Sequence, residues 1–314
     1  MEEVTKMKKR KSLLICGLLV FLLGVCFTGG YFWRGNIVDN MPSDTIAVPE
    51  NPVSPSFAEQ KNVNILLLGS DSRGKDVGRT DSIIFVSANL ETKEVSMVSI
   101  PRDTRVDIPG VGLTKITHAN VAGGKEQGIE KVIQSVSNLL GAPINNYALV
   151  DFQGFKKLVD ALGGIDIELP NGINDYMQNL YLPAGQNHLD GDQALRLARV
   201  RYSLPNGDFG RQWYQYKILA SIADKALTKE SIIKLPELLK IAGNDLVQTD
   251  MTQAEILALA TKFAGFKPSE LNYYQIPGSS LTALDPLVGA NVYYFEADKT
   301  GLKEIMQKIY GPKA

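Results

Sequence analysis

The sequence predicts one layered α/β domain that follows a single membrane-spanning helix. Three observations predict it: an uncharged apolar run near the N-terminus, strand-like apolar runs from residue 62 onward, and helix-period segments between those runs. The 314 residues are 44% hydrophobic and 21% charged, with a formal net charge of −1. This balance argues against a nucleic-acid-binding protein, which usually carries a basic excess.

The N-terminal segment has the pattern of a membrane anchor. Residues 1–11 are rich in lysine and arginine, and residues 12–33 contain no charge. At about 1.5 Å per residue this run can cross a hydrocarbon core of about 30 Å. The positive-inside rule places residues 1–11 in the cytoplasm and the rest of the chain outside, as in a single-pass type II protein. The alternative is a cleaved signal peptide, which the length of the run and the lack of an A-x-A site disfavour.

Both cysteines, Cys16 and Cys26, lie inside this run, so the outer domain can form no disulfide. The sequence contains two histidines, which excludes histidine-rich zinc chemistry. Residues 34–60 contain Pro, Ser and acidic residues and read as an extended linker. The predicted outer domain therefore spans residues 61–314.

The first strands follow directly. Residues 63–69, VNILLLG, form a short apolar run typical of a buried strand. Residues 82–90 and 94–100 read as a strand pair with a short connection. A further strand, IDIEL, is expected at 165–169.

Helix-period segments alternate with these strands. Asp190 and Gln193 resemble a capping box, and Gly141 and Gly163 have the place of helix stop signals. The expected helices span 125–140, 152–162, 191–198, 211–227 and 253–264.

Polar side chains gather where the predicted strands begin and end, which is where ligands bind in open α/β sheets. Arg199 and Arg201 share a face if that segment is extended, and Arg211 and Gln215 share a helix face. Arginine pairs suit bidentate contacts to phosphate oxygens, and Asp71 and Asp81 are hard oxygen ligands that suit Mg²⁺. The polar residues in this pattern are Asp71, Arg73, Arg79, Asp81, Arg102, Asp103, Arg105, Arg199, Arg201, Asp208, Arg211 and Gln215.

Each piece also has a simpler interpretation. An aspartate after a strand more often caps a turn, and an arginine pair on a strand is usually solvated. The segment GSDSRG lacks the ending of a P-loop, and Asp208-Phe209-Gly210 lacks the other kinase motifs. His118 is expected to be structural. The residues alone therefore indicate an extracytoplasmic, phosphate-binding, Mg²⁺-dependent domain.

Seven motifs in order resemble the LytR–CpsA–Psr family. They cover about residues 62–228, with weaker similarity to Tyr310, and read NILLLGSDSR, RTDSIIFVSAN, VSIPRDTRVDIPG, TKITHANVAGG, VDFQGFKKLVDALGGIDIELP, LPAGQNHLDGDQALRLARVR and GDFGRQWYQ. The resemblance implies an α/β/α sandwich with a central mixed sheet and an apolar pocket for a polyprenyl chain.

The resemblance also implies an activity. Members move anionic glycopolymers, such as teichoic acid or capsular polysaccharide, from a polyprenyl-pyrophosphate carrier to peptidoglycan in Gram-positive bacteria. A hydrolase acting on the same carrier and a non-enzymatic, membrane-anchored regulator remain alternatives. The expected partners are the lipid-linked polymer, peptidoglycan and the membrane, with no nucleic acid.

Matched residue by residue, the resemblance makes Asp71 and Asp81 the Mg²⁺ ligands. It makes Asp71, Asp103 and Arg105 candidate catalytic residues, with Asp71 or Asp103 as the base. The expected pyrophosphate contacts are Arg79, Arg102, Arg199, Arg201, Arg211 and Gln215.

Overall fold

The computed structural model describes residues 60–71, 78–228, 231–232 and 247–311. The expected tail, the expected membrane helix and all of the expected linker except Gln60 lie outside these residues. In the part of the chain that the structure describes, no helix is both long enough and apolar enough to cross a bilayer.

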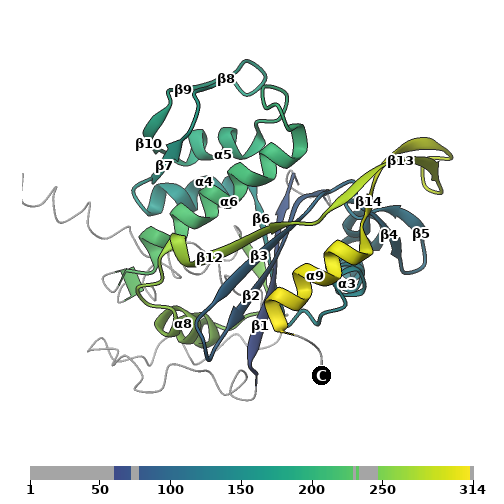
Figure 1. Ribbon diagram of the computed structural model, residues 1–314, viewed down its shortest axis with the longest axis horizontal. Helices are drawn as coiled ribbons and strands as arrows, with labels where there is room; N and C mark the ends of the chain where they lie inside the picture. Colours follow the sequence, from purple (N-terminus) through teal and green to yellow (C-terminus); the bar gives the residue numbers. More distant parts are fainter. Residues whose placement is uncertain (1–59, 72–77, 229–230, 233–246, 312–314) are drawn as a thin grey trace, which may run out of the picture.

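A six-stranded mixed sheet forms the centre of the domain, in the order β11-β6-β1-β2-β3-β12 (Figure 1). Its neighbouring pairs are antiparallel except β1 with β6 and β3 with β12, which are parallel. The strands are β1 (Asn62–Ser70), β2 (Thr80–Asn89), β3 (Val95–Ile100), β6 (Asn146–Asp151), β11 (Val247–Thr249) and β12 (Leu271–Gln275). The expected first strand and the expected strand pair are confirmed.

Helices cover both faces of this sheet, because successive residues of β1 point to opposite sides. Ile65 and Leu67 are buried against one helical layer, and Leu66 and Leu68 against the other. The first layer holds α4 (Phe152–Ala161), α5 (Gly191–Arg199), α6 (Gly207–Ala226) and α8 (Gln253–Lys262). The second holds α3 (His118–Leu140) and α9 (Lys299–Tyr310). The predicted mixed sheet with flanking helices is confirmed.

Helix ends follow local sequence signals, and α3 has an additional part before its expected first residue. The side chains of Asp190 and Gln193 form the expected capping box, and Gly141 closes α3 at a φ of 62°. α3 is broken at Gly124, which has a non-helical φ of 62°, so the part after the break begins at residue 125 as expected, and a short part that begins at His118 precedes it. The sequence did not predict this first part, because Gly123 and Gly124 interrupt the helical pattern of apolar residues.

In the described part of the chain, four antiparallel strand pairs lie outside the central sheet (Figure 1). The expected strand at 165–169 is β7, and it pairs with a strand that the sequence did not predict. The pairs are β4 (Arg105–Ile108) with β5 (Gly112–Lys115), β7 (Ile165–Leu169) with β10 (Gly185–Leu189), β8 (Ile173–Asp175) with β9 (Leu180–Leu182), and β13 (Gly278–Asp285) with β14 (Ala290–Ala297). A short 3₁₀ helix, η2 (Pro268–Glu270), precedes β12.

The strand directions bring the predicted polar residues to one edge of the sheet. β1, β3 and β6 all end at this edge, and β2 begins there. Ser70 pairs with Thr80 on one side and with Asp151 on the other. Asp71, Asp81 and Arg102 therefore come from three neighbouring strands, although they lie up to thirty-one positions apart.

Candidate active site

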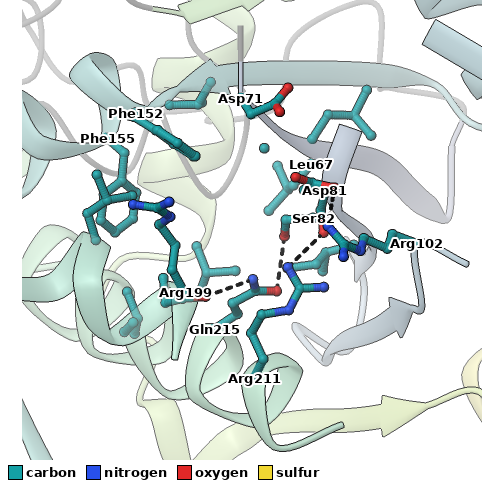
Figure 2. Close-up of a pocket in the computed structure, with 18 of the residues that line it drawn as sticks. Leu67, Asp71, Asp81, Ser82, Arg102, Phe152, Phe155, Arg199, Arg211 and Gln215 are labelled. Atoms are coloured by element: carbon teal, nitrogen blue, oxygen red, sulfur yellow. Dashed lines mark hydrogen bonds and ion pairs between the residues drawn. The ribbon is translucent and has the colours of Figure 1, made fainter. Parts of the chain in front are cut away.

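A cavity of about 320 Å³ opens at this edge, between the sheet and the α4–α6 layer (Figure 2). Its volume lies at the small end of the range for small-molecule sites. Its polar lining contains most of the predicted site: Asp71, Asp81, Arg102, Arg199, Arg201, Arg211 and Gln215.

The same cavity has an apolar wall. Leu67, Ile84 and Val150 come from the sheet, and aromatic and aliphatic side chains come from the helices. The helical part of this wall is Phe152, Phe155, Leu195, Ala198, Ile218 and Leu219. One cavity thus combines hydrocarbon surface with several guanidinium groups, as an amphipathic anion requires.

Asp81 and Arg102 form an ion pair at the cavity. Arg102 Nη1 lies 2.7 Å from Asp81 Oδ1, and its Nε lies 3.9 Å from Asp103 Oδ2. Burial alone would lower the pKa of Arg102, but the carboxylates of Asp81, Asp103 and Asp208 outweigh burial and raise it. Arg102 is therefore a fixed positive charge.

Arg211 is the most deeply buried arginine among those at the cavity. Its Nη2 lies 2.8 Å from Asp208 Oδ1, and its Nη1 donates to the backbone oxygen of Asp81 at 3.1 Å. Burial lowers its pKa despite the attraction of Asp208. A guanidinium nevertheless stays protonated in proteins, so Arg211 brings a pre-oriented charge to the cavity.

Gln215 lies one helical turn beyond Arg211 and joins three elements. Its Nε2 donates to the backbone oxygen of Ala198 at 3.1 Å, and its Oε1 accepts from Ser82 Oγ at 3.1 Å (Figure 2). The predicted shared face of Arg211 and Gln215 is confirmed. Ser82 was not predicted, because no motif marks an isolated serine as a support for a site residue.

Arg199 and Arg201 both line the cavity, but not from an extended strand. Arg199 is the last residue of α5, and Arg201 follows the helix. The guanidinium of Arg199 lies 4.9 Å from the centre of the Phe152 ring, and no acidic side chain among the described residues pairs with it. Arg201 Nε lies 3.8 Å from Asp208 Oδ1. Arg199 thus brings a charge to the cavity that no described carboxylate neutralises.

Asp71 and Asp81 fit a magnesium site in their chemistry. Both carboxylates line the cavity, and Asp71 Oδ1 accepts a hydrogen bond from the backbone nitrogen of Arg79 at 2.8 Å. Mg²⁺ commonly binds one or two carboxylates and takes its other ligands from water and substrate phosphates. Among the described residues no group of three or more His, Cys, Asp and Glu could hold a metal ion.

Four of the described candidate residues lie off the cavity wall, and one of them, Asp208, pairs with Arg211. Arg79 is exposed and contributes its backbone nitrogen to Asp71. Asp103 pairs with Lys115 at 2.7 Å. Arg105 belongs to a second cavity, and its guanidinium lies 5.5 Å from the centre of the Tyr294 ring. Arg105 is thus not grouped with the other predicted site residues in the first cavity, and its catalytic role stays a prediction.

His118 has the surroundings expected of a structural histidine. Its Nδ1 lies 2.9 Å from Thr114 Oγ1 and 3.9 Å from Asp285 Oδ2. Burial lowers its pKa, and the attraction of Asp285 only partly opposes this effect.

The sequence motifs match a known family over most of the chain. The model of the LytR_cpsA_psr family covers residues 36–310, beginning inside the expected linker.

The chain belongs to the LytR–CpsA–Psr family.

Relatives within the LytR–CpsA–Psr family support this assignment over nearly the full length. The polyisoprenyl-teichoic acid–peptidoglycan teichoic acid transferase TagU of Bacillus anthracis is 32% identical over 314 residues, which cover 96% of this chain and 97% of TagU. The crystal structure of Bacillus subtilis TagV superposes with a TM-score of 0.69 at 34% identity, over 80% of this chain and 96% of TagV. A structure of a transcriptional regulator from Enterococcus faecalis superposes with a TM-score of 0.66 at 29% identity, over 81% of this chain and 89% of the regulator.

Proposed function

We propose that this LytR–CpsA–Psr protein transfers an anionic glycopolymer, a teichoic acid or a capsular polysaccharide, from a polyprenyl-pyrophosphate carrier to a sugar hydroxyl of peptidoglycan. One observation carries the proposal: the cavity joins an apolar wall to a group of arginines. The apolar wall suits the polyprenyl chain, and the arginines suit the pyrophosphate. The names of TagU and TagV, as teichoic acid transferases, support the same substrate class.

The arginines hold the reacting phosphates in this proposal. Arg102, Arg199, Arg201 and Arg211 each bring a guanidinium to the cavity, where bidentate contacts to phosphate oxygens neutralise their charge. Arg211 is fixed by Asp208, so its orientation is set before the substrate binds. Arg79 is exposed beside Asp71, and we place it at the outer rim of the phosphate site.

Magnesium is part of the proposal, with Asp71 and Asp81 as its protein ligands. A bound Mg²⁺ would neutralise pyrophosphate charge and polarise the phosphorus under attack. Asp81 is held by Arg102 and Asp71 by the backbone of Arg79, so both carboxylates are oriented by the protein itself.

The chemical step breaks the phosphoanhydride bond of the carrier and forms a phosphodiester bond to the acceptor. The acceptor hydroxyl oxygen bonds to the phosphorus that carries the glycopolymer, and the bridging P–O bond to polyprenyl phosphate breaks. The hydroxyl proton passes to a carboxylate. Asp71 lines the cavity, whereas Asp103 is engaged by Lys115, so we assign this role to Asp71.

Location follows from the substrate. A polyprenyl carrier resides in the membrane and peptidoglycan lies outside it, so we propose a single-pass type II protein of a Gram-positive cell membrane with its domain outside. Hydrolysis of the same carrier is the main alternative, because it would use the same phosphate contacts with water in place of the acceptor. A regulator would require neither the arginines nor the apolar wall.

Binding of the two separate parts of the carrier, the polyprenyl chain and the pyrophosphate, tests the proposed site directly. A short-chain polyprenyl pyrophosphate should bind the protein, and both the matching polyprenyl alcohol and inorganic pyrophosphate should bind far more weakly in calorimetry with Mg²⁺. Equal affinity for the alcohol would show that the arginines take no part in binding. Equal affinity for free pyrophosphate would show that the apolar wall takes no part in binding.

A further inference from the structure

Four large side chains are strongly exposed beside one hairpin. Tyr176 and Met177 lie in the turn between β8 and β9, and Tyr181 lies in β9; the three residues are 85%, 57% and 75% exposed. Tyr202, in the segment after α5, is 75% exposed. These four residues are called the β8–β9 tip below. Monomeric soluble proteins rarely group exposed apolar side chains in this way unless the surface makes a contact.

The exposure of the tip is imposed by the structure. Asp175 is buried, and its Oδ1 accepts from the backbone nitrogen of Gln178 at 2.9 Å while its Oδ2 accepts from Ser203 Oγ at 2.8 Å. Arg196 Nη1 donates to the backbone oxygens of Gln178 and Asn179 at 3.0 and 3.1 Å. The turn is therefore held from both sides, and Ser203 ties the segment of Tyr202 to it.

The tip borders the mouth of the cavity. Gln178, in the β8–β9 turn, and Tyr202 both line the cavity, whereas Tyr176, Met177 and Tyr181 do not. The apolar wall of the cavity continues with Leu195 and Ala198 of α5. Tyr202 of the tip thus lines the same cavity as the apolar side chains Leu195 and Ala198 of the proposed polyprenyl site.

We propose that the β8–β9 tip is a membrane contact, which seats in the headgroup region of the bilayer and aligns the cavity mouth with it. This inference rests on the proposed function, because a polyprenyl chain must pass from the bilayer into the cavity. Tyrosine has an apolar ring and a polar hydroxyl, which suits the boundary between lipid and water.

The chain outside the described residues is long enough for this orientation. Figure 1 shows β8 and β9 at the opposite end of the molecule from the start of β1. Residues 34–59 could span about 90 Å when fully extended. A domain of this size has a radius of gyration of about 18 Å. The anchor therefore permits the far end to face the membrane.

Quenching by brominated lipid tests which face meets the bilayer. The full chain with Trp33→Phe, which leaves Trp213 as its only tryptophan, is reconstituted in vesicles of brominated phosphatidylcholine with a minor fraction of phosphatidylglycerol. Three variants of this parent each add one tryptophan: Tyr181→Trp at the tip, Leu287→Trp on the β13–β14 turn, and Lys308→Trp on α9. Leu287 and Lys308 are exposed and are not part of the tip.

The proposal predicts that the added emission of Tyr181→Trp is quenched, because interfacial side chains enter the bilayer by about 5–10 Å. The emission added by Lys308→Trp should not be quenched, so it should be the same in brominated and in unbrominated vesicles. Quenching at Leu287 or Lys308 without quenching at Tyr181 would overturn the proposal, and so would quenching at none of the three.

A second measurement separates this proposal from the proposed function. The triple variant Tyr176→Ser, Met177→Ser, Tyr181→Ser removes exposed side chains that do not line the cavity. Its turnover of a long-chain carrier in vesicles should fall roughly tenfold, because apolar contact area with the bilayer is lost. Its turnover of a short-chain carrier in solution should equal that of the parent. If the triple variant turned over both the long-chain and the short-chain carrier as fast as the parent, the membrane contact would be contradicted. Quenching at Tyr181 in a protein without any transfer activity would reject the proposed function alone.

Discussion

Arg102 and Asp81 form an ion pair across the ends of two neighbouring strands, with 2.7 Å between Nη1 and Oδ1. β3 ends just before Arg102, and β2 begins just before Asp81. The pair therefore exists because the two strands are antiparallel and in register, with Ile83 opposite Ile100. It places a proposed metal ligand and a proposed phosphate contact side by side.

Asp81→Asn tests the proposed metal site. The substitution keeps the size of the side chain but removes its charge, so Mg²⁺ loses a ligand and Arg102 loses its partner. We expect Mg²⁺-dependent transfer to fall roughly 100-fold or more, while thermal unfolding changes little because Asp81 is at the surface of the cavity. Asp224→Asn, at an exposed position of α6, is the matched control. Normal activity and a normal Mg²⁺ response in Asp81→Asn would remove Asp81 from the site.

Arg199→Lys and Arg201→Lys test the proposed phosphate contacts. Lysine keeps the charge but loses the planar fork of donors. Each lost charge-assisted contact should cost about 1.5–3 kcal/mol, which weakens carrier binding roughly 10- to 100-fold. Arg105→Lys should leave binding unchanged, because Arg105 lines the other cavity. Titration with a short-chain carrier measures the affinity of all three variants. An unchanged affinity in Arg199→Lys and Arg201→Lys would show that these arginines are solvated and do not contact the phosphates.

Asp285 gives a prediction about stability and pH. Burial alone would raise the pKa of Asp285, but hydrogen bonds from Thr114, Tyr294, and the backbone of Val288 and Leu287 lower it to about 2. Because the folded pKa lies below the unfolded value of 3.8, the stabilisation is present above about pH 4 and is lost as the pH falls toward 2.

Asp285→Asn should therefore lower the free energy of unfolding by about 2 kcal/mol at neutral pH. The difference from the unmodified protein should shrink as the pH is lowered from 4 to 2, as measured by urea unfolding at a series of pH values. A difference that is independent of pH would mean that the carboxylate charge of Asp285 does not matter to the fold. The exposed Asp224 again provides the control substitution.

The proposed orientation in the membrane can be tested on whole cells. The basic cluster before residue 12 predicts that the domain lies outside. Protease added to intact protoplasts should degrade the domain and spare a tag placed at the N-terminus. A domain that survives until the membrane is opened would reverse the orientation.

Local sequence signals predicted much of the fold. The apolar run of β1, the strand pair β2 and β3, and the capping box of Asp190 all depend on neighbouring residues, and all are found in the structure. The four-residue spacing of Arg211 and Gln215 likewise set their shared face. The family motifs then identified the residues that the sheet edge brings together.

Contacts between distant segments could not be predicted in the same way. Thr114 Oγ1 donates to Asp285 Oδ2 across 171 positions, and no periodicity records such a pairing. The position of Arg105 depends on the direction in which β4 leaves the sheet, which its motif does not specify. The apolar wall depends on Val150 of the sheet and Ile218 of α6, distant in the sequence, lining the same cavity.

Dependence on the acceptor tests the central claim most directly. The full-length protein, with Mg²⁺ and a short-chain polyprenyl-pyrophosphate sugar, is incubated with and without peptidoglycan oligomers, and the products are analysed by mass spectrometry. We predict slow release of polyprenyl phosphate without the acceptor, faster release with it, and a glycan joined to the sugar through a phosphodiester. Release that ignores the acceptor and leaves the sugar phosphate free in solution would contradict transfer and identify the protein as a hydrolase.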